Sequence, residues 1–79
     1  MSKIFEVWFD PCIYSECVME CFSTLEDAKE FVKQLRKEKR PIIKSGRKCS
    51  ISIDLLEVEE IGKINFIKTV YHKEYNYKK

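Results

Sequence analysis

The stretch STLEDAKEFVKQL, residues 23–35, decides the fold because it combines a helix start signal with helical periodicity. Ser23 and Glu26 form the S-x-x-E pattern of a capping box, in which each side chain binds the other residue's backbone N–H. Apolar residues then recur at three- and four-residue steps and form one stripe: Leu25, Ala28, Phe31, Val32 and Leu35. Basic residues follow from Arg36, and Pro41 is expected to end the helix.

Two strands are predicted before this helix. Residues 3–9 (KIFEVWF) alternate between two faces that are both substantially apolar, which is typical of a central strand. Residues 10–15 (DPCIYS) contain Asp and Pro, which favour a hairpin loop. Residues 16–22 (ECVMECF) then return as the second strand.

Two more strands are predicted after the helix. Residues 48–58 (KCSISIDLLEV) alternate clearly until Leu55, where the phase slips, and a one-residue bulge at Leu55–Leu56 is expected to keep Leu56 and Val58 pointing inward. Gly62 marks a turn. Residues 63–72 (KINFIKTVYH) also fit a helical stripe, but their β-branched and aromatic residues favour a fourth strand.

The order β-β-α-β-β predicts an α+β fold, with a four-stranded, mainly antiparallel sheet and one helix on one face. We expect a single domain over residues 1–72 and a polar C-terminal tail over residues 73–79. One helix covers only one face of such a sheet. The open face is expected to carry Ile4, Trp8, Cys17 and Met19, which predicts a homodimer packed sheet to sheet or a face reserved for a partner protein.

The four cysteines, Cys12, Cys17, Cys21 and Cys49, are expected to be free thiols in a reducing cytoplasm, because the N-terminal residues contain no secretory signal. Cys17, Cys21 and Cys49 fall in predicted strands, where cysteine packs as a small core residue. Zinc is not expected, since Cys17 and Cys21 would stand about 13 Å apart along a strand. No apolar run approaches the roughly 18 residues that span a membrane.

Catalytic patterns are missing from the sequence. It contains no phosphate-binding loop, nucleophile elbow or zinc-protease motif, so we expect a protein that is not an enzyme and that has no cofactor or metal. Glu57 and Glu59 share one strand face, but solvated charges explain them better than a cation site does. His72 is expected to be an exposed imidazole.

A cationic segment, residues 36–48 (RKEKRPIIKSGRK), carries seven basic side chains against one carboxylate and is predicted to link the helix to the next strand. Such a loop suits an anionic ligand. The phosphate contacts are expected from Arg40, Lys44, Arg47 and Lys48, with a hydrogen bond from Ser45 and base stacking on Trp8 or a tail tyrosine. A solvated lysine-rich connection remains the alternative.

The C-terminal residues add an aromatic and basic pattern. Three tyrosines, Tyr71, Tyr75 and Tyr77, alternate with lysines in a way that is similar to proteins that stack bases of single-stranded nucleic acids. Ordinary packing of tyrosines in a terminal strand is the alternative.

The segments ECFSTLEDAKEFVKQL and SISIDLLEVEE together resemble many short uncharacterised phage and prophage proteins of Gram-positive bacteria. Such proteins include counter-defence factors that bind a host protein or sequester a nucleotide signal. The resemblance implies a phage-type counter-defence factor. Together with the missing catalytic motifs, the open sheet face and the basic segment, this predicts a non-catalytic, homo-oligomeric binding protein whose basic loop takes an anionic, nucleotide-like ligand. The alternatives are an inhibitor that occupies a host defence or nucleic-acid-processing enzyme through the apolar sheet face, and an RNA- or DNA-binding accessory protein.

Overall fold

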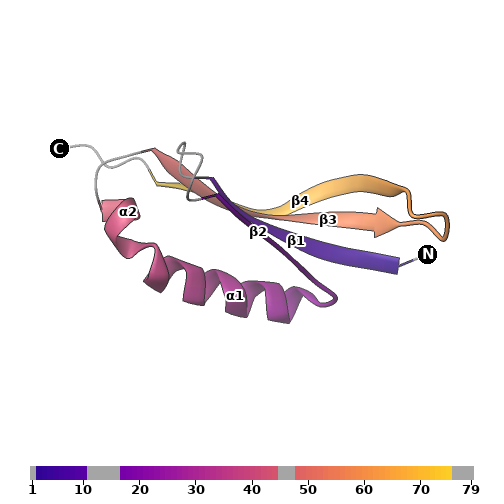
Figure 1. Cartoon of the computed structure of the whole chain (residues 1–79), viewed down its shortest axis with the longest axis horizontal. Helices are drawn as coiled ribbons and strands as arrows, with labels where there is room; N and C mark the ends of the chain where they lie inside the picture. The colour runs from indigo at the N-terminus through magenta and orange to yellow at the C-terminus, as the bar shows by residue number, and fades with distance from the viewer. Residues whose placement is uncertain (1, 11–16, 45–47, 76–79) are drawn as a thin grey trace.

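The computed structural model describes residues 2–10, 17–44 and 48–75. They form a four-stranded antiparallel sheet, in the order β2-β1-β3-β4, with helix α1 packed on one face (Figure 1). The elements are β1 (Ser2–Asp10), β2 (Val18–Phe22), α1 (Leu25–Glu38), α2 (Arg40–Lys44), β3 (Cys49–Val58) and β4 (Ile64–Tyr75). The α+β fold predicted from the sequence is confirmed, and β1 is a central strand as expected.

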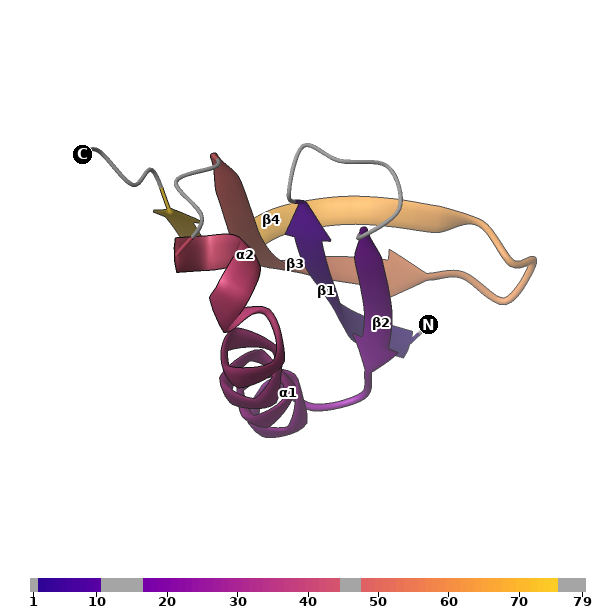
Figure 2. The same ribbon diagram turned by 60° about the vertical axis from the view of Figure 1, so that its left-hand side comes forward.

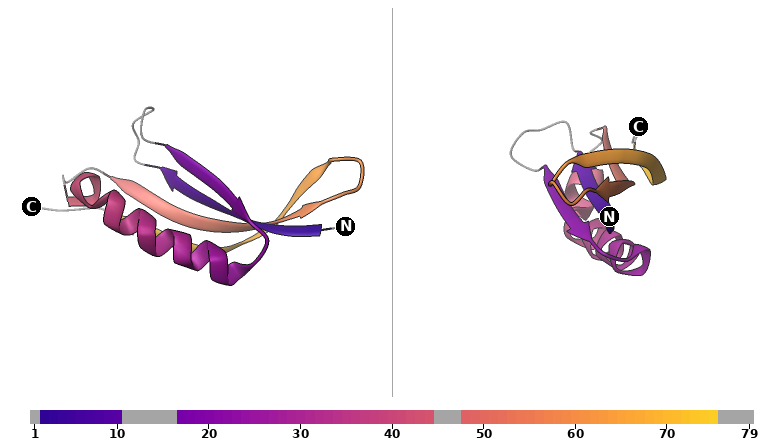
Figure 3. Two further views of the ribbon diagram at one scale, coloured as in Figure 1. Left: turned by 60° about the horizontal axis from the view of Figure 1, so that its bottom comes forward. Right: turned by 90° about the vertical axis from the view of Figure 1, so that its right-hand side faces the viewer.

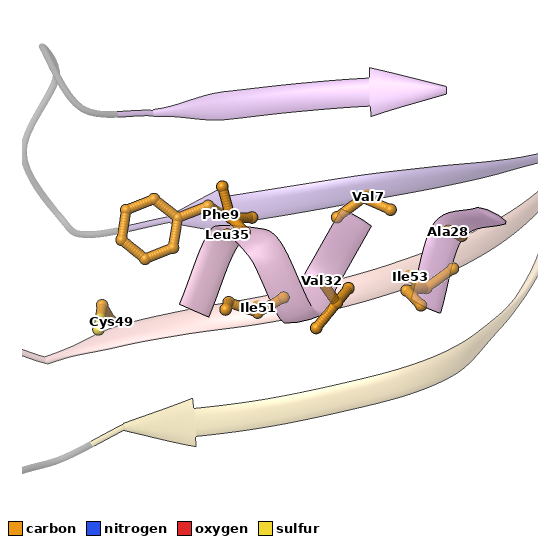
Figure 4. Packing of buried hydrophobic residues seen from close by; sticks show 8 residues of the cluster. All are labelled: Val7, Phe9, Ala28, Val32, Leu35, Cys49, Ile51 and Ile53. Carbon is orange, nitrogen blue, oxygen red and sulfur yellow. The ribbon is translucent and has the colours of Figure 1, made fainter. Parts of the chain in front are cut away.

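The core lies between α1 and the two central strands. Ala28, Val32 and Leu35 of α1 are buried, as the apolar stripe predicts. They face buried side chains from alternate positions of the sheet, namely Val7, Phe9, Cys49, Ile51 and Ile53 (Figure 4). Removing these apolar side chains from water is the main stabilising contribution in a domain this small.

The N-terminus of α1 is capped by Thr24, one residue later than the sequence predicts. Thr24 has an extended backbone, and its Oγ1 accepts a hydrogen bond from the backbone N–H of Asp27 at 3.2 Å. The capping pattern assigned this role to Ser23, which was wrong. Glu26 and Asp27 occupy the first turn, where their negative charges interact favourably with the positive end of the helix dipole.

Pro41 does not end the helical structure. Helix α1 stops at Glu38, where the N–H of Lys39 still donates to the carbonyl oxygen of Leu35, and the short helix α2 begins at Arg40 (Figure 2). Pro41 therefore lies in the first turn of α2, where a missing N–H costs nothing. The described part of the cationic segment is mostly helical and not a loop, which corrects the prediction.

The pairing of β3 explains why Leu56 does not join the main core. Between β1 and β3 the register is continuous, with Phe5 opposite Leu55 and Ile4 opposite Leu56. Since directly paired residues share a face, Leu56 points away from α1, and it is nevertheless only 7% exposed. The expected inward orientation of Leu56 was wrong.

The irregularity itself lies where the sequence predicts it, but the extra residues belong to β4. The β3–β4 register shifts between Ile53 and Asp54 and again between Leu55 and Leu56. The β4 partners step from Tyr71 to Thr69 and from Lys68 to Phe66, which leaves Val70 and Ile67 as the added residues. Val70 packs against the core.

The turn between β3 and β4 contains Gly62, as expected. Gly62 has a φ of 87°, its N–H donates to the carbonyl oxygen of Glu59 at 2.9 Å, and the N–H of Glu59 donates to the carbonyl oxygen of Lys63 at 2.8 Å. A three-residue hairpin loop with glycine in the left-handed region has this pattern. Strand β4 then runs to Tyr75, so residues 73–75 belong to the sheet and not to a tail.

The chain is elongated, with extents of 47 × 22 × 20 Å and a radius of gyration of 13.6 Å, against about 12 Å for a compact chain of this length. The excess comes from a hairpin arm, residues 55–68, that projects beyond α1 (Figure 3). Four of its large apolar side chains are exposed: Ile61 by 83%, Ile64 by 58%, Phe66 by 62% and Ile67 by 41%.

The face opposite α1 also carries apolar side chains, partly as expected. Met19 is 53% exposed, while Ile4 and Trp8 are half-buried. Cys17 and Cys21 are exposed thiols and not core residues, whereas Cys49 is buried. Cys12 and most of the predicted hairpin loop lie outside the described residues.

Candidate anion-binding groove

A basic groove runs between α1 and β4 on the covered side of the sheet. It consists of two adjoining hollows of about 480 and 150 Å³, which share Lys33 and Arg36 in their walls. Its cationic wall contains Lys29, Lys33, Arg36, Lys37 and Arg40, and its other lining residues are Val32, Ile43, Ile53, Tyr71 and Tyr75. The described lining includes no carboxylate, so all of its described charged side chains are cations.

Helical spacing explains why the charges gather on this side of α1. Lys29, Lys33, Arg36 and Lys37 are separated by four-, three- and one-residue steps that keep them beside the buried stripe on the flank near β4. The opposite flank carries Asp27, Glu30 and Gln34, which line a separate hollow with Phe22 and Phe31. The rings of Phe22 and Phe31 pack 5.1 Å apart there. Helix α1 therefore has an acidic flank toward β2 and a basic flank toward β4.

Strand β4 supplies the opposite wall. Tyr71 pairs with Ile53 and Tyr75 pairs with Cys49, and because both partners are core residues, both tyrosines point to the side of the sheet that carries α1. Both remain half-buried. Lys73, between them, places its Nζ atom 5.8 Å from the centre of the Tyr75 ring and adds a sixth cation beside the groove.

The hydroxyl of Tyr75 is the one buried side-chain polar atom in the described residues without a hydrogen-bond partner. Burial raises the pKa of this hydroxyl, against the lowering effect of the Arg36 charge. Tyr71 also raises this pKa, but its side chain is not placed to form a hydrogen bond with the Tyr75 hydroxyl. At neutral pH the hydroxyl is therefore a protonated donor, and a buried donor without an acceptor lowers the stability of a fold.

Of the predicted ligand-binding residues whose side chains the structure describes, Arg40 lines the groove. Lys48 is exposed directly before β3. Lys44 ends α2, and its side chain lies outside the described part of the chain, as do Ser45 and Arg47.

Trp8 lies on the opposite face of the sheet from the groove. It pairs with Ser52, and its Nε1–H donates to Oε1 of Glu6 at 2.6 Å on that face. Within one chain the sheet therefore separates Trp8 from Arg40, so a site that combines them needs a second copy of the chain, and base stacking on Trp8 stays a prediction.

Four groove cations, Lys29, Lys33, Arg36 and Lys37, were not among the predicted site residues. The density of basic residues along the chain peaks after residue 36 and therefore indicates the segment 36–48. Their helical spacing was the available signal, because it puts them on one flank of a helix whose start and apolar stripe were already recognised.

Other chemistry in the described residues is sparse. They contain no group of three or more His, Cys, Asp or Glu side chains arranged to hold a metal ion. His72 is exposed and lies 3.3 Å from the carboxylate of Glu74. Among the helices of the described chain, none has both the length and the apolar character to cross a bilayer.

Comparisons with known proteins return no match: no family model fits the chain, and neither a curated protein nor a solved structure is significantly similar. The resemblance to short phage proteins therefore stays a prediction.

Proposed function

We propose that this chain is a non-catalytic binding protein that holds a phosphate-bearing, nucleotide-like ligand in the basic groove. The observation that carries the proposal is the combination of five cationic side chains, no carboxylate in the described lining and a buried Tyr75 hydroxyl without an acceptor. Phosphate oxygens would accept hydrogen bonds from the arginines, lysines and Tyr75 together.

The two hollows suit the two parts of a nucleotide. The larger one, lined by Arg36, Lys37, Arg40 and Tyr75, favours the phosphates. The smaller one has Val32, Ile53 and Tyr71 in its walls and favours a flat, weakly polar base. The described lining offers no carboxylate, histidine or cysteine as a general base or nucleophile, which supports binding and not catalysis.

Isothermal titration calorimetry tests the proposal with a panel of nucleoside phosphates, cyclic dinucleotides, single-stranded oligonucleotides and inorganic triphosphate. The double variant Arg36→Glu/Lys37→Glu reverses two groove charges and should abolish binding. Lys3→Glu/Lys63→Glu changes the net charge equally at exposed positions outside the groove and should retain it. The proposal fails if no phosphate compound binds wild-type protein or if both variants bind equally.

In the setting implied by the sequence resemblance, a phage-type counter-defence factor, this binding would protect the phage by removing a nucleotide signal. Expression in a defended host should then raise phage plating efficiency, and the Arg36→Glu/Lys37→Glu variant should not.

A second proposed role, self-association, is favoured by a different observation. The hairpin arm exposes Ile61, Ile64, Phe66 and Ile67, and large apolar side chains gathered on one projecting element are typical of an interface. We assign this surface to a second copy of the chain; a host protein bound there instead would support the inhibitor alternative.

A further inference from the structure

We propose that the ligand of the basic groove is a short segment of single-stranded nucleic acid, held along α1, and not an isolated mononucleotide. This inference rests on the proposed function, because it concerns the same groove. The inference specifies the length, the direction and the single-stranded character of the ligand. Three features of the groove support it.

The first feature is the spacing of the cations. Lys29 and Lys37 are eight residues apart on α1, which corresponds to about 12 Å along the helix axis. Lys33 and Arg36 lie between them, so the wall presents about one positive charge every 4 Å. A stacked nucleic-acid strand carries one phosphate about every 3.4 Å. The cationic wall and such a strand therefore have similar linear charge densities, and Arg40 continues the wall at the α2 end.

The second feature is the pair of tyrosines on the facing wall. Tyr71 and Tyr75 are four residues apart on one strand face, which separates them by about 13 Å. That distance corresponds to about four stacked bases. Each ring is half-buried, and tyrosine rings that border a cationic channel are the usual platforms for unpaired bases. A mononucleotide reaches only one of the two rings.

The third feature is the direction of the groove. Lys29, Lys33 and Arg36 line the smaller hollow with Tyr71, while Lys33, Arg36, Lys37 and Arg40 line the larger one with Tyr75. The cationic wall and the tyrosine wall thus run side by side over the same distance. A strand lying between them would place its phosphates toward α1 and its bases toward β4. A duplex has its bases stacked inside and cannot use the tyrosine wall.

The experiment measures fluorescence anisotropy of a labelled deoxythymidine hexanucleotide with unlabelled competitors of one, two, four, six and ten nucleotides, and with a duplex. Affinity should rise steeply up to four or five nucleotides and then level off, with the duplex at least tenfold weaker. An oligouridine of the same length is measured in parallel, and the ratio of the two affinities shows whether the groove prefers RNA or DNA.

Salt dependence gives an independent readout. If four or five phosphates are neutralised, log K should fall with log salt at a slope of about −3, which is about 60-fold between 50 and 200 mM salt. Lys29→Ser and Lys33→Ser should each reduce the slope by about 0.7, while the control Lys3→Ser, at an exposed position outside the groove and the arm, should not change it. Tyr71→Leu, which keeps an apolar side chain, should weaken binding about tenfold without changing the slope.

The outcomes separate the two levels of the proposal. If a mononucleotide competes as well as the hexanucleotide, or if the duplex binds as tightly, the inference is wrong and the proposed function stands. If no phosphate compound of any length binds, both are wrong. If Arg36→Glu/Lys37→Glu binds oligonucleotides with the same affinity and the same length dependence as wild type, the nucleic-acid site lies outside this groove. That result would overturn the inference.

Discussion

Cys49 and Tyr75 are direct partners in the antiparallel ladder between β3 and β4. Cys49 is 1% exposed, so its partner is fixed on the side of the sheet that carries α1. This pairing at the last position of β4 brings Tyr75 into the lining of the basic groove together with Arg40 and Ile43 of α2, and its hydroxyl is buried. The C-terminal end of the sheet is therefore part of the candidate site.

The unpaired hydroxyl predicts opposite effects on stability and binding for Tyr75→Phe. Removing a buried donor without an acceptor should leave the free energy of unfolding unchanged or raise it by up to about 1 kcal/mol. Polyanion binding should weaken about tenfold, since a hydrogen bond to a charged group contributes roughly 1.5 kcal/mol. Urea denaturation and anisotropy measure the two effects. A clear loss of stability would show that the hydroxyl has a partner in the ligand-free protein.

Burial predicts which of two core substitutions lowers the free energy of unfolding more. Leu35 is 2% exposed, so Leu35→Ala should cost about 2–5 kcal/mol, which approaches the whole stability of a small domain. Phe31 is only half-buried and packs mainly beside Phe22, so Phe31→Ala should cost less. Urea denaturation gives the order. If Phe31→Ala proves the more damaging change, α1 is rotated from the orientation described.

The helix cap gives a matched pair of variants. Thr24→Ala removes the oxygen that accepts from Asp27 and should cost about 1 kcal/mol. Ser23→Ala removes an exposed hydroxyl outside the helix and should stay within about 0.5 kcal/mol of wild type. Thermal unfolding of the two proteins distinguishes them, and equal melting temperatures would contradict the cap.

The thiol of Cys21 should be slow to react. Partial burial raises its pKa, and the negative charges of Glu6 and Glu20 raise it further, so less thiolate is present at a given pH. Glu6→Gln/Glu20→Gln should therefore speed alkylation of Cys21 by iodoacetamide at pH 8, as followed by peptide mass spectrometry. Alkylation of Cys17 in the same samples is the control. An unchanged rate at Cys21 would remove the electrostatic explanation.

The hairpin arm predicts self-association. Wild-type protein should sediment with at least twice the monomer mass at high concentration, because Phe66 and Ile64 are more than half exposed. Phe66→Glu should shift the distribution toward monomer, since a carboxylate buried without a partner is costly. Met19→Glu, on β2 and away from the arm, is the control. A monomer at all concentrations would contradict this interface.

Local sequence patterns predict the elements of this fold well. The stripe from Leu25 to Leu35 identifies α1, and alternation identifies β1 and most of β3, because each element must bury one face. The errors arose where two local choices have similar energies. Ser23 and Thr24 are both good caps, and Pro41 suits both the end of one helix and the first turn of the next.

The groove could not be predicted in the same way because it depends on tertiary placement. Lys33 and Tyr75 are far apart in the sequence, and they line one hollow only because β4 pairs with β3 on the basic flank of α1. Nothing local specifies the strand order β2-β1-β3-β4. The density of basic residues in the sequence therefore predicts an anionic ligand. Which side chains surround the groove depends on the tertiary structure.

The two extra residues of β4, Val70 and Ile67, behave like a compensating pair of insertions in a reading frame. The first reverses the up-and-down alternation of the strand and the second restores it, so that Phe66 and Tyr71 keep the faces that an unbroken strand would give them. Deleting either residue alone would turn over one end of the strand relative to the other. Deleting both would preserve the groove and the arm together, so natural length variation in this strand should come in steps of two.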